Sequence, residues 1–146
     1  MEIRNIYYYP NPILNQSCEK VTIFDDQLKK LVSDMKATTK YYNGCGLAAP
    51  QIGINKCLFV VVYQGRELAI INPQVISKEG SERLEEGCLS IPNVSIEVDR
   101  ATQITLSAQN ENGESVLLEE SGFFARIIQH EYDHIIGKLI LDYQEK

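Results

Sequence analysis

The chain has 146 residues, of which 44% are apolar and 23% charged, and a formal net charge of −6. A chain of about this length supports one hydrophobic core, so we expect a single domain over residues 1–146. No apolar run reaches the ~18 residues of a membrane helix, and the N-terminus lacks the basic start and apolar middle of a secretion signal. We therefore expect a cytoplasmic protein without membrane association. Its dispersed basic residues argue against direct binding of nucleic acid.

The four cysteines, Cys18, Cys45, Cys57 and Cys88, form no C-x-x-C pair. A cytoplasmic chain of this size does not need disulfides to stay folded, so the pattern predicts none. A cysteine in such a chain is usually a small buried apolar residue. Only its local context can assign it a chemical role.

A first helix is predicted over residues 25–42. Asp25 is a potential N-cap, and apolar side chains follow at spacings of three, four and seven, namely Leu28, Leu31, Val32, Met35 and Tyr42. This pattern is typical of an amphipathic helix packed on a core.

The middle of the chain is predicted to be antiparallel β-structure. Two β-branched runs, 56–63 and 67–73, are separated by Gln64-Gly65-Arg66, which predicts a hairpin. Asn112-Gly113 is typical of a tight turn. The other predicted strands are 74–79, 81–86, 95–101, 103–109 and 114–120.

A second helix is predicted to begin after Ser121, its potential N-cap, and to end at Gly137. It is apolar around most of its circumference, so it should be buried. The order of helix, strands and helix predicts an α+β fold, in which antiparallel sheets pack around this central C-terminal helix.

Both histidines of the chain, His130 and His134, lie in this helix at positions i and i+4, with Glu131 beside the first. Two imidazoles one turn apart on the same face can bind one metal ion, and the H-E-x-x-H pattern makes the glutamate a general base. The alternative, two structural histidines in the core, is disfavoured because burying imidazoles and a carboxylate without partners is costly.

A catalytic site of this type needs a third protein ligand. The position that supplies a third histidine in some metalloproteases is Ile140, and only twelve residues follow His134, too few for a glutamate on a later helix. The third ligand must then be a thiolate or a carboxylate from earlier in the chain, or Asp142. Cys88 is the best placed cysteine, because Gly87 allows close backbone approach and Pro92 ends strand pairing; its thiolate suits Fe(II), Co(II) or Zn(II).

Three blocks occur in this order: "GCGLAAPQIG" (44–53), "EGCLS" (86–90) and "QHEYDH" (129–134). Together they resemble peptide deformylase, and the similar layout runs from about residue 5 to residue 142. The resemblance implies a hydrolase that removes the formyl group from the N-terminal formylmethionine of new polypeptides and releases formate. It also implies that Cys88, His130 and His134 bind Fe(II), that zinc, nickel or cobalt can replace the iron, and that Glu131 is the acid/base.

The same resemblance implies further roles. The Gln51 amide and the Leu89 backbone N–H would stabilise the oxyanion, and the peptide would pair with the backbone at Gly44 and Gly46. The remaining substrate-binding candidates are Cys45, Leu84, Glu86, Gly87, Phe123 and Ile127, with Arg126 either at the pocket rim or directed into solvent. Asp133 is expected to orient a ligand histidine or to pair with Arg100, and Gln129 to serve packing.

The chain departs from the family at Cys45, where Val or Ile is common, and at Asn93, where Gly is common. We also expect the chain to lack the long basic C-terminal helix with which many bacterial forms dock on the ribosome. We therefore expect a monomer that binds formylmethionyl nascent peptides with at most transient ribosome proximity, in a bacterial cell, a virus-infected bacterium or an organelle.

Two alternatives remain open at this point. A small H-E-x-x-H metallopeptidase would use a carboxylate as third ligand and would keep its metal in a Cys88→Ala variant. A metal-storage or regulatory module would perform equally well with Glu131→Gln.

Overall fold

The computed structural model describes residues 1–144, so the expected domain 1–146 ends in two residues outside this range. Its helices are α1 (Asp26–Tyr41) and α2 (Gly122–Ile135), with 3-10 turns η1 (Pro12–Asn15), η2 (Ala49–Ile52) and η3 (Ile140–Tyr143). Its strands are β1 (Gly46–Ala48), β2 (Leu58–Tyr63), β3 (Arg66–Glu79), β4 (Glu82–Cys88), β5 (Ile91–Arg100), β6 (Gln103–Gln109) and β7 (Ser115–Ser121).

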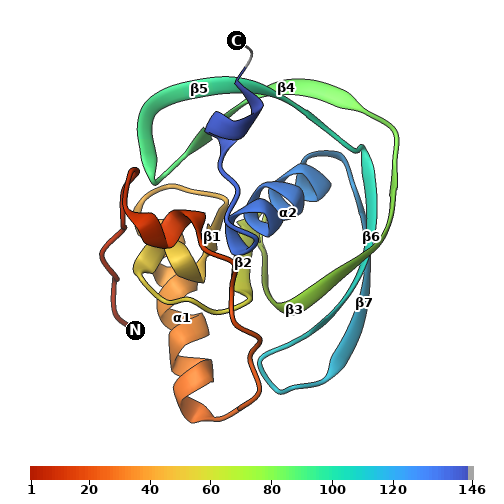
Figure 1. Cartoon of the computed structure of the whole chain (residues 1–146). Helices are drawn as coiled ribbons and strands as arrows, with labels where there is room; N and C mark the ends of the chain where they lie inside the picture. Colours follow the sequence, from red (N-terminus) through yellow and green to blue (C-terminus); the bar gives the residue numbers. More distant parts are fainter. Residues whose placement is uncertain (145–146) are drawn as a thin grey trace.

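The strands form two antiparallel sheets around α2. The larger sheet has the order β1-β2-β3-β6-β7, and β4 and β5 form a separate two-stranded sheet. In Figure 1, α2 runs through the middle of the molecule, β3, β6 and β7 curve along one side of it, and β4 and β5 pass over its end. The predicted α+β fold with a central C-terminal helix is confirmed.

Helix α1 begins where the sequence predicted. The Asp25 carboxylate accepts a hydrogen bond from the Leu28 N–H at 3.0 Å, which caps the helix. Leu28, Leu31, Val32 and Met35 are buried against β1, β2 and β3. This first core cluster lies on the opposite side of the sheet from α2, whose buried residues pack in a second cluster.

Strands β2 and β3 form the predicted hairpin. Gln64 and Gly65 both have positive φ angles, 49° and 79°, as a tight two-residue hairpin turn requires. The runs 67–73 and 74–79 were predicted as separate strands, but they form one strand with a shift of register between Ile71 and Gln74. At this irregularity the Asn72 side chain bonds to both backbone groups of Val21, at 2.8 and 2.9 Å, and thereby anchors the N-terminal segment.

The ends of α2 agree with the prediction only in part. Ser121 occupies the N-cap position, but its side chain makes no capping hydrogen bond, so that element of the prediction is wrong. Gly137 has a φ of 80° just beyond the helix, as predicted. A Cβ at Gly137 would lie 2.8 Å from the Asn15 carbonyl oxygen, so close packing of the N-terminal segment adds a second reason for glycine.

A disulfide joins Cys18 and Cys57, so the prediction that the chain has none is wrong. Two backbone hydrogen bonds place the N-terminal segment beside the core here: the Cys18 N–H donates to the Ile135 carbonyl, and the Cys57 N–H donates to the Glu19 carbonyl, both at 2.9 Å. The two cysteines are 39 residues apart in sequence. No local spacing pattern could therefore have indicated the pair, whereas Cys45 and Cys88 are free.

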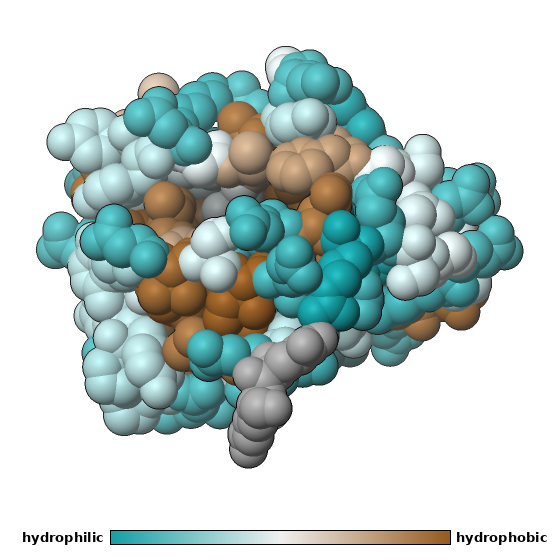
Figure 2. All heavy atoms as spheres, turned by 90° about the horizontal axis from the view of Figure 1, so that it is seen from above, coloured by the Kyte–Doolittle hydropathy of each residue, from teal (hydrophilic) through white to brown (hydrophobic). Residues whose placement is uncertain are grey.

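A third core cluster lies at the end of the molecule that carries β4, β5 and η3. Leu14, Ile91, Ile96, Val98, Leu139 and Ile140 are buried in it. Figure 2 looks onto this end and shows apolar side chains gathered in a hollowed central area within a hydrophilic surround. Among residues 1–144, no helix combines the length and apolarity needed to cross a bilayer.

Candidate metal centre and active site

The three predicted metal ligands meet at one point. Cys88 is the last residue of β4, and His130 and His134 lie one turn apart on α2. Their potential ligand atoms all lie within 4.8 Å of one another, and the Cys88 Sγ is 3.3 Å from the His134 Nε2. The pairing of β4 with β5 shifts register between Glu86 and Cys88, and such a bulge redirects the side chain that follows it.

These groups fit a divalent transition-metal ion. One thiolate and two imidazoles are three protein donors of the kind that leave a coordination position open for chemistry. Next to them, the buried Glu131 Oε1 has no hydrogen-bond partner among the described residues. A buried carboxylate oxygen without a partner is costly, so the site is arranged for groups beyond the protein's own.

Glu86 holds His130 in position. Its Oε1 lies 2.9 Å from the His130 Nδ1, which leaves the Nε2 of the ring for an ion. Arg100 binds both oxygens of the same carboxylate, at 2.8 and 2.9 Å, and Arg126 contacts Oε2 at 2.6 Å. Burial alone would raise the pKa of Glu86, but hydrogen bonds from Arg100 and His130 lower it to about 2. Glu86 was predicted only as a substrate-binding residue; its contact with His130 was missed.

A second part of this network reaches the C-terminal segment. Asp133 pairs with Arg100 at 2.6 Å, one of the two expected alternatives, and does not contact a ligand histidine. The Tyr143 hydroxyl donates to the same Asp133 oxygen at 2.7 Å and accepts from Arg100 at 3.2 Å. Tyr143 was not among the predicted site residues, because nothing in its sequence neighbourhood indicates a buried ion pair ten residues earlier. Gln129, expected to serve packing, bonds to both backbone groups of Ala101.

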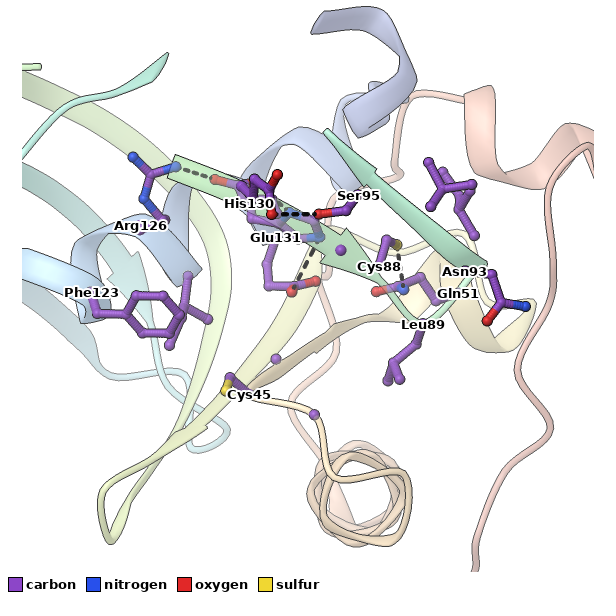
Figure 3. A pocket seen from close by; sticks show the side chains of 18 residues that line it. Cys45, Gln51, Cys88, Leu89, Asn93, Ser95, Phe123, Arg126, His130 and Glu131 are labelled. Atoms are coloured by element: carbon purple, nitrogen blue, oxygen red, sulfur yellow. Dashed lines mark hydrogen bonds and ion pairs between the residues drawn. The ribbon is translucent and has the colours of Figure 1, made fainter. Parts of the chain in front are cut away.

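Glu131 lies against the backbone of β1. A Cβ on Gly46 would be 2.7 Å from the Glu131 Oε2, so only glycine allows this approach. Glu131 is 4% exposed, and burial raises its pKa to about 7. Figure 3 shows its side chain between Cys88 and Gln51 on one side and Phe123 on the other.

The Gln51 amide is fixed at both ends. Its Oε1 accepts from the Ala48 N–H at 2.9 Å, and its Nε2 donates to the Ser90 Oγ at 3.2 Å and lies 3.6 Å from the Cys88 Sγ. Gln51 is therefore held beside Cys88 in one orientation. The supporting role of Ser90 was not predicted.

A cavity of ≈ 530 Å³ opens in front of these residues. Its lining includes most of the predicted substrate-binding residues, namely Gly44, Cys45, Gly46, Glu86, Gly87, Phe123 and Ile127, together with Gln51, Leu89 and Arg126. Burial raises the pKa of Cys45, so its thiol contributes an uncharged surface. Leu84 is the exception: it is 41% exposed on β4 and lies outside the lining. Arg126, expected at the rim or in solvent, is buried in its contact with Glu86.

The first half of β5 supplies lining residues that were not predicted. They are Ile91, Asn93, Val94 and Ser95. Asn93 has a φ of 64°, a left-handed conformation that asparagine tolerates better than most residues. The departure from glycine noted at this position is thus compatible with the same backbone.

Comparison with known proteins agrees with this geometry. The profile of the polypeptide deformylase family matches residues 3–146. The chain belongs to this family. It is 43% identical over 140 residues to the peptide deformylase of Dictyoglomus thermophilum, covering 96% of this chain and 92% of that protein. It is 42% identical over 146 residues to peptide deformylase 1 of Clostridium perfringens, covering 99% of each.

The structural comparison gives the same result. The crystal structure of the Thermotoga maritima peptide deformylase superimposes with a TM-score of 0.95 at 40% identity, over 97% of each chain. Members of this family are metal-dependent hydrolases that remove the formyl group from N-terminal formylmethionine, and this activity is that of the chain. The metallopeptidase and metal-storage alternatives are therefore set aside.

Proposed function

We propose that Cys88, His130 and His134 together bind one divalent ion, with Fe(II) as the physiological ion, and that Glu131 is the acid/base of deformylation. The observation that carries this proposal is the convergence of the three ligand atoms within 4.8 Å beside a buried carboxylate oxygen that lacks a partner. When bound, the ion supplies Lewis-acid chemistry that polarises a carbonyl and lowers the pKa of water.

Glu131 would move the proton. It takes a proton from the attacking water and returns it to the departing amine of the methionine. A general acid/base works best when its pKa lies near the working pH. Burial raises the pKa of Glu131 above that of an exposed glutamate, which favours its uptake of a proton.

Gln51 and Leu89 would stabilise the oxyanion that forms from the formyl carbonyl. The Gln51 amide is already oriented by the Ala48 N–H and the Ser90 hydroxyl, so it need not reorganise during the reaction. Preorganised donors of this kind contribute roughly 2.7 to 4 kcal/mol each in comparable sites.

The substrate peptide would bind along β1. This strand is at the end of the five-stranded sheet, so one of its edges is free to pair with an extended peptide. The peptide would pair with the backbone at Gly44 and Gly46. The methionine side chain would enter the cavity among Cys45, Phe123 and Ile127, all of which line it.

The setting of the reaction is also a proposal. We infer that the chain acts as a monomer on nascent peptides in the cytoplasm of a bacterial cell, a virus-infected bacterium or an organelle. Its net charge of −6 disfavours stable binding to ribosomal RNA, so any encounter with the ribosome is brief.

Formate release from formyl-Met-Ala-Ser tests the proposal. The metal-free protein is loaded anaerobically with Fe(II), Ni(II), Co(II) or Zn(II), and turnover and bound metal are measured for each. We expect turnover that a chelator removes, with Fe(II) at least as effective as Zn(II). Absence of turnover with every ion would contradict the function, and high activity with Zn(II) alone would contradict the assignment of iron.

A further inference from the structure

Arg126 is a buried cation one helical turn before His130 on α2, and it is only 4% exposed. Its guanidinium donates to the Glu86 Oε2 at 2.6 Å, a contact that the dashed line from Arg126 marks in Figure 3. It also donates to the carbonyl of Glu82 on β4 and, at 3.0 Å, to that of Val98 on β5. One side chain of α2 is thus bound to both strands of the β4–β5 pair.

The contacts of Arg126 lie beside the metal ligands. On α2, Arg126, His130 and His134 follow one another at intervals of four residues, so their side chains share one side of the helix. On β4, Glu86 comes two residues before Cys88, which supplies the third ligand. The pair of Arg126 with Glu86 therefore joins the same two elements that the three ligands join.

Apolar packing places α2 and β5 in different parts of the core. The buried apolar residues of α2 belong to the second core cluster, whereas those of β5 belong to the third. The catalytic cavity lies between the two elements, because Phe123 and Ile127 line it from α2 and Ile91 and Val94 line it from β5. Since a cavity separates these apolar side chains, their packing does not fix the distance between α2 and the β4–β5 pair.

Polar contacts bridge this gap instead. Asp133 on α2 pairs with Arg100 on β5 at 2.6 Å. His130 on α2 contacts Glu86 on β4 at 2.9 Å. Arg126 differs from these side-chain pairs because it also binds backbone carbonyls of both strands, and a guanidinium presents its donors in a rigid planar fork. Its contacts therefore hold the strands themselves and not only a side chain that can rotate.

A metal site requires this distance to be well defined, because ligand distances are typically kept within about 0.2 Å of their preferred values. We propose that Arg126 is a positioning residue of the metal centre. It holds the β4–β5 pair on α2 and thereby sets the position of Cys88 relative to the two histidines. This inference rests on the proposed ligand set.

Metal affinity tests the proposal. Arg126→Met keeps a long side chain and removes every donor, so affinity for Zn(II), measured by competition with a chromophoric chelator, should fall about tenfold, as when other supports of metal ligands are lost. Arg126→Lys keeps the charge but not the planar fork, so its affinity should fall by a similar factor. Arg66→Met is the matched control and should keep the affinity of the parent. Arg66 binds both oxygens of Glu120, at 2.8 and 2.9 Å, and lies on β3.

Hydrogen exchange of the metal-free proteins locates the effect. Amides of residues 82–100 should exchange about threefold or more faster in Arg126→Met than in the parent, because a local contact of these strands is lost. Amides of α1, which packs in the first core cluster, should exchange at the parent rate. Equal acceleration in α1 would indicate a general loss of stability and would overturn the positioning role.

Failure of this inference is distinguishable from failure of the proposed function. Zn(II) affinity equal to that of the parent in Arg126→Met or in Arg126→Lys would overturn the inference and leave the proposed ligand set intact. If Arg126→Met does not fold, Arg126→Lys supplies both measurements. A parent protein that binds no divalent ion would overturn both.

Discussion

Glu86 and Asp34 are two buried carboxylates with the same electrostatic character and different positions in the fold. Burial opposes ionisation of each, yet hydrogen-bonded partners lower the pKa of both to about 2. Asp34 binds the Glu2 N–H, Arg4 and Lys30, at 2.8 to 3.0 Å, and so fastens the N-terminus to α1. Glu86 binds Arg100 and Arg126 and reaches His130.

The difference teaches that a depressed pKa identifies a charge network and not its purpose. Structural ion pairs perturb pKa values as active sites do. What distinguishes Glu86 is that its network ends on a predicted metal ligand, at the wall of a cavity. The network of Asp34 ends on the protein's own N-terminus.

The largest effect is expected at neither carboxylate but at Glu131, the residue next to His130 on α2. Glu131→Gln keeps the size of the side chain and removes its ability to carry a proton, so kcat should fall by about 10²- to 10⁴-fold. Metal content, measured by elemental analysis, should equal that of the parent. A variant with normal kcat would show that another group transfers the proton.

The next largest effect is expected on metal affinity, which should depend on Glu86 and not on Asp34. Glu86→Gln removes the charged partner of His130 and should weaken metal affinity by about 10- to 100-fold, as loss of such a partner does in other metal sites. Asp34→Asn should leave metal affinity unchanged. Competition with a chromophoric chelator measures both. Equal affinities for the two variants would remove the functional distinction.

Asp34 should instead affect how the free energy of unfolding depends on pH. Its pKa is about 2 in the folded protein and ~3.9 in an unfolded chain. A lowered folded-state pKa contributes stability that is present above pH ~4 and lost as the pH falls toward ~2, here about 1 to 2 kcal/mol. Urea unfolding at several pH values should therefore show parent and Asp34→Asn differing most above pH ~5 and converging in acid. A difference independent of pH would contradict the assignment.

The smallest effect is expected for Tyr143→Phe. It removes the hydrogen bond to Asp133 and the longer one from Arg100, while the ion pair between Asp133 and Arg100 remains. Hydrogen bonds to charged groups contribute roughly 1.5 to 3 kcal/mol, and the remaining ion pair should reduce the loss to about 1 kcal/mol of unfolding free energy. Metal affinity should fall less than in Glu86→Gln. A larger fall than in that variant would place Tyr143 closer to the ion than the structure does.

The sequence predicted the elements whose pattern is local. The Asp25 cap, the helical spacing after it and the turn at Gln64-Gly65 each depend on a few neighbouring residues, and the structure has them where expected. The sequence blocks at 86–90 and 129–134 likewise contain Cys88, His130 and His134, whose potential ligand atoms the structure brings within 4.8 Å of one another.

The rest depends on contacts between distant segments. The Cys18–Cys57 disulfide, the bond between Glu86 and His130, and the link from Tyr143 to Asp133 join residues that share no local pattern. The short strand β1 was missed because its three residues lie inside a glycine-rich block that has no strand periodicity. Leu84 was expected in the methionine pocket but lies outside the lining of the cavity. The sequence of a strand does not show how far along that strand a cavity extends.

X-ray absorption spectroscopy of the metal-loaded protein tests the central claim most directly. The account predicts one sulfur and two imidazole nitrogens around the ion, for zinc at about 2.3 Å and about 2.0 to 2.1 Å. Cys88→Ala should lose the sulfur scatterer, whereas Cys45→Ala, which removes the other free thiol, should keep it. A spectrum without sulfur, or one unchanged in Cys88→Ala, would contradict the proposed site.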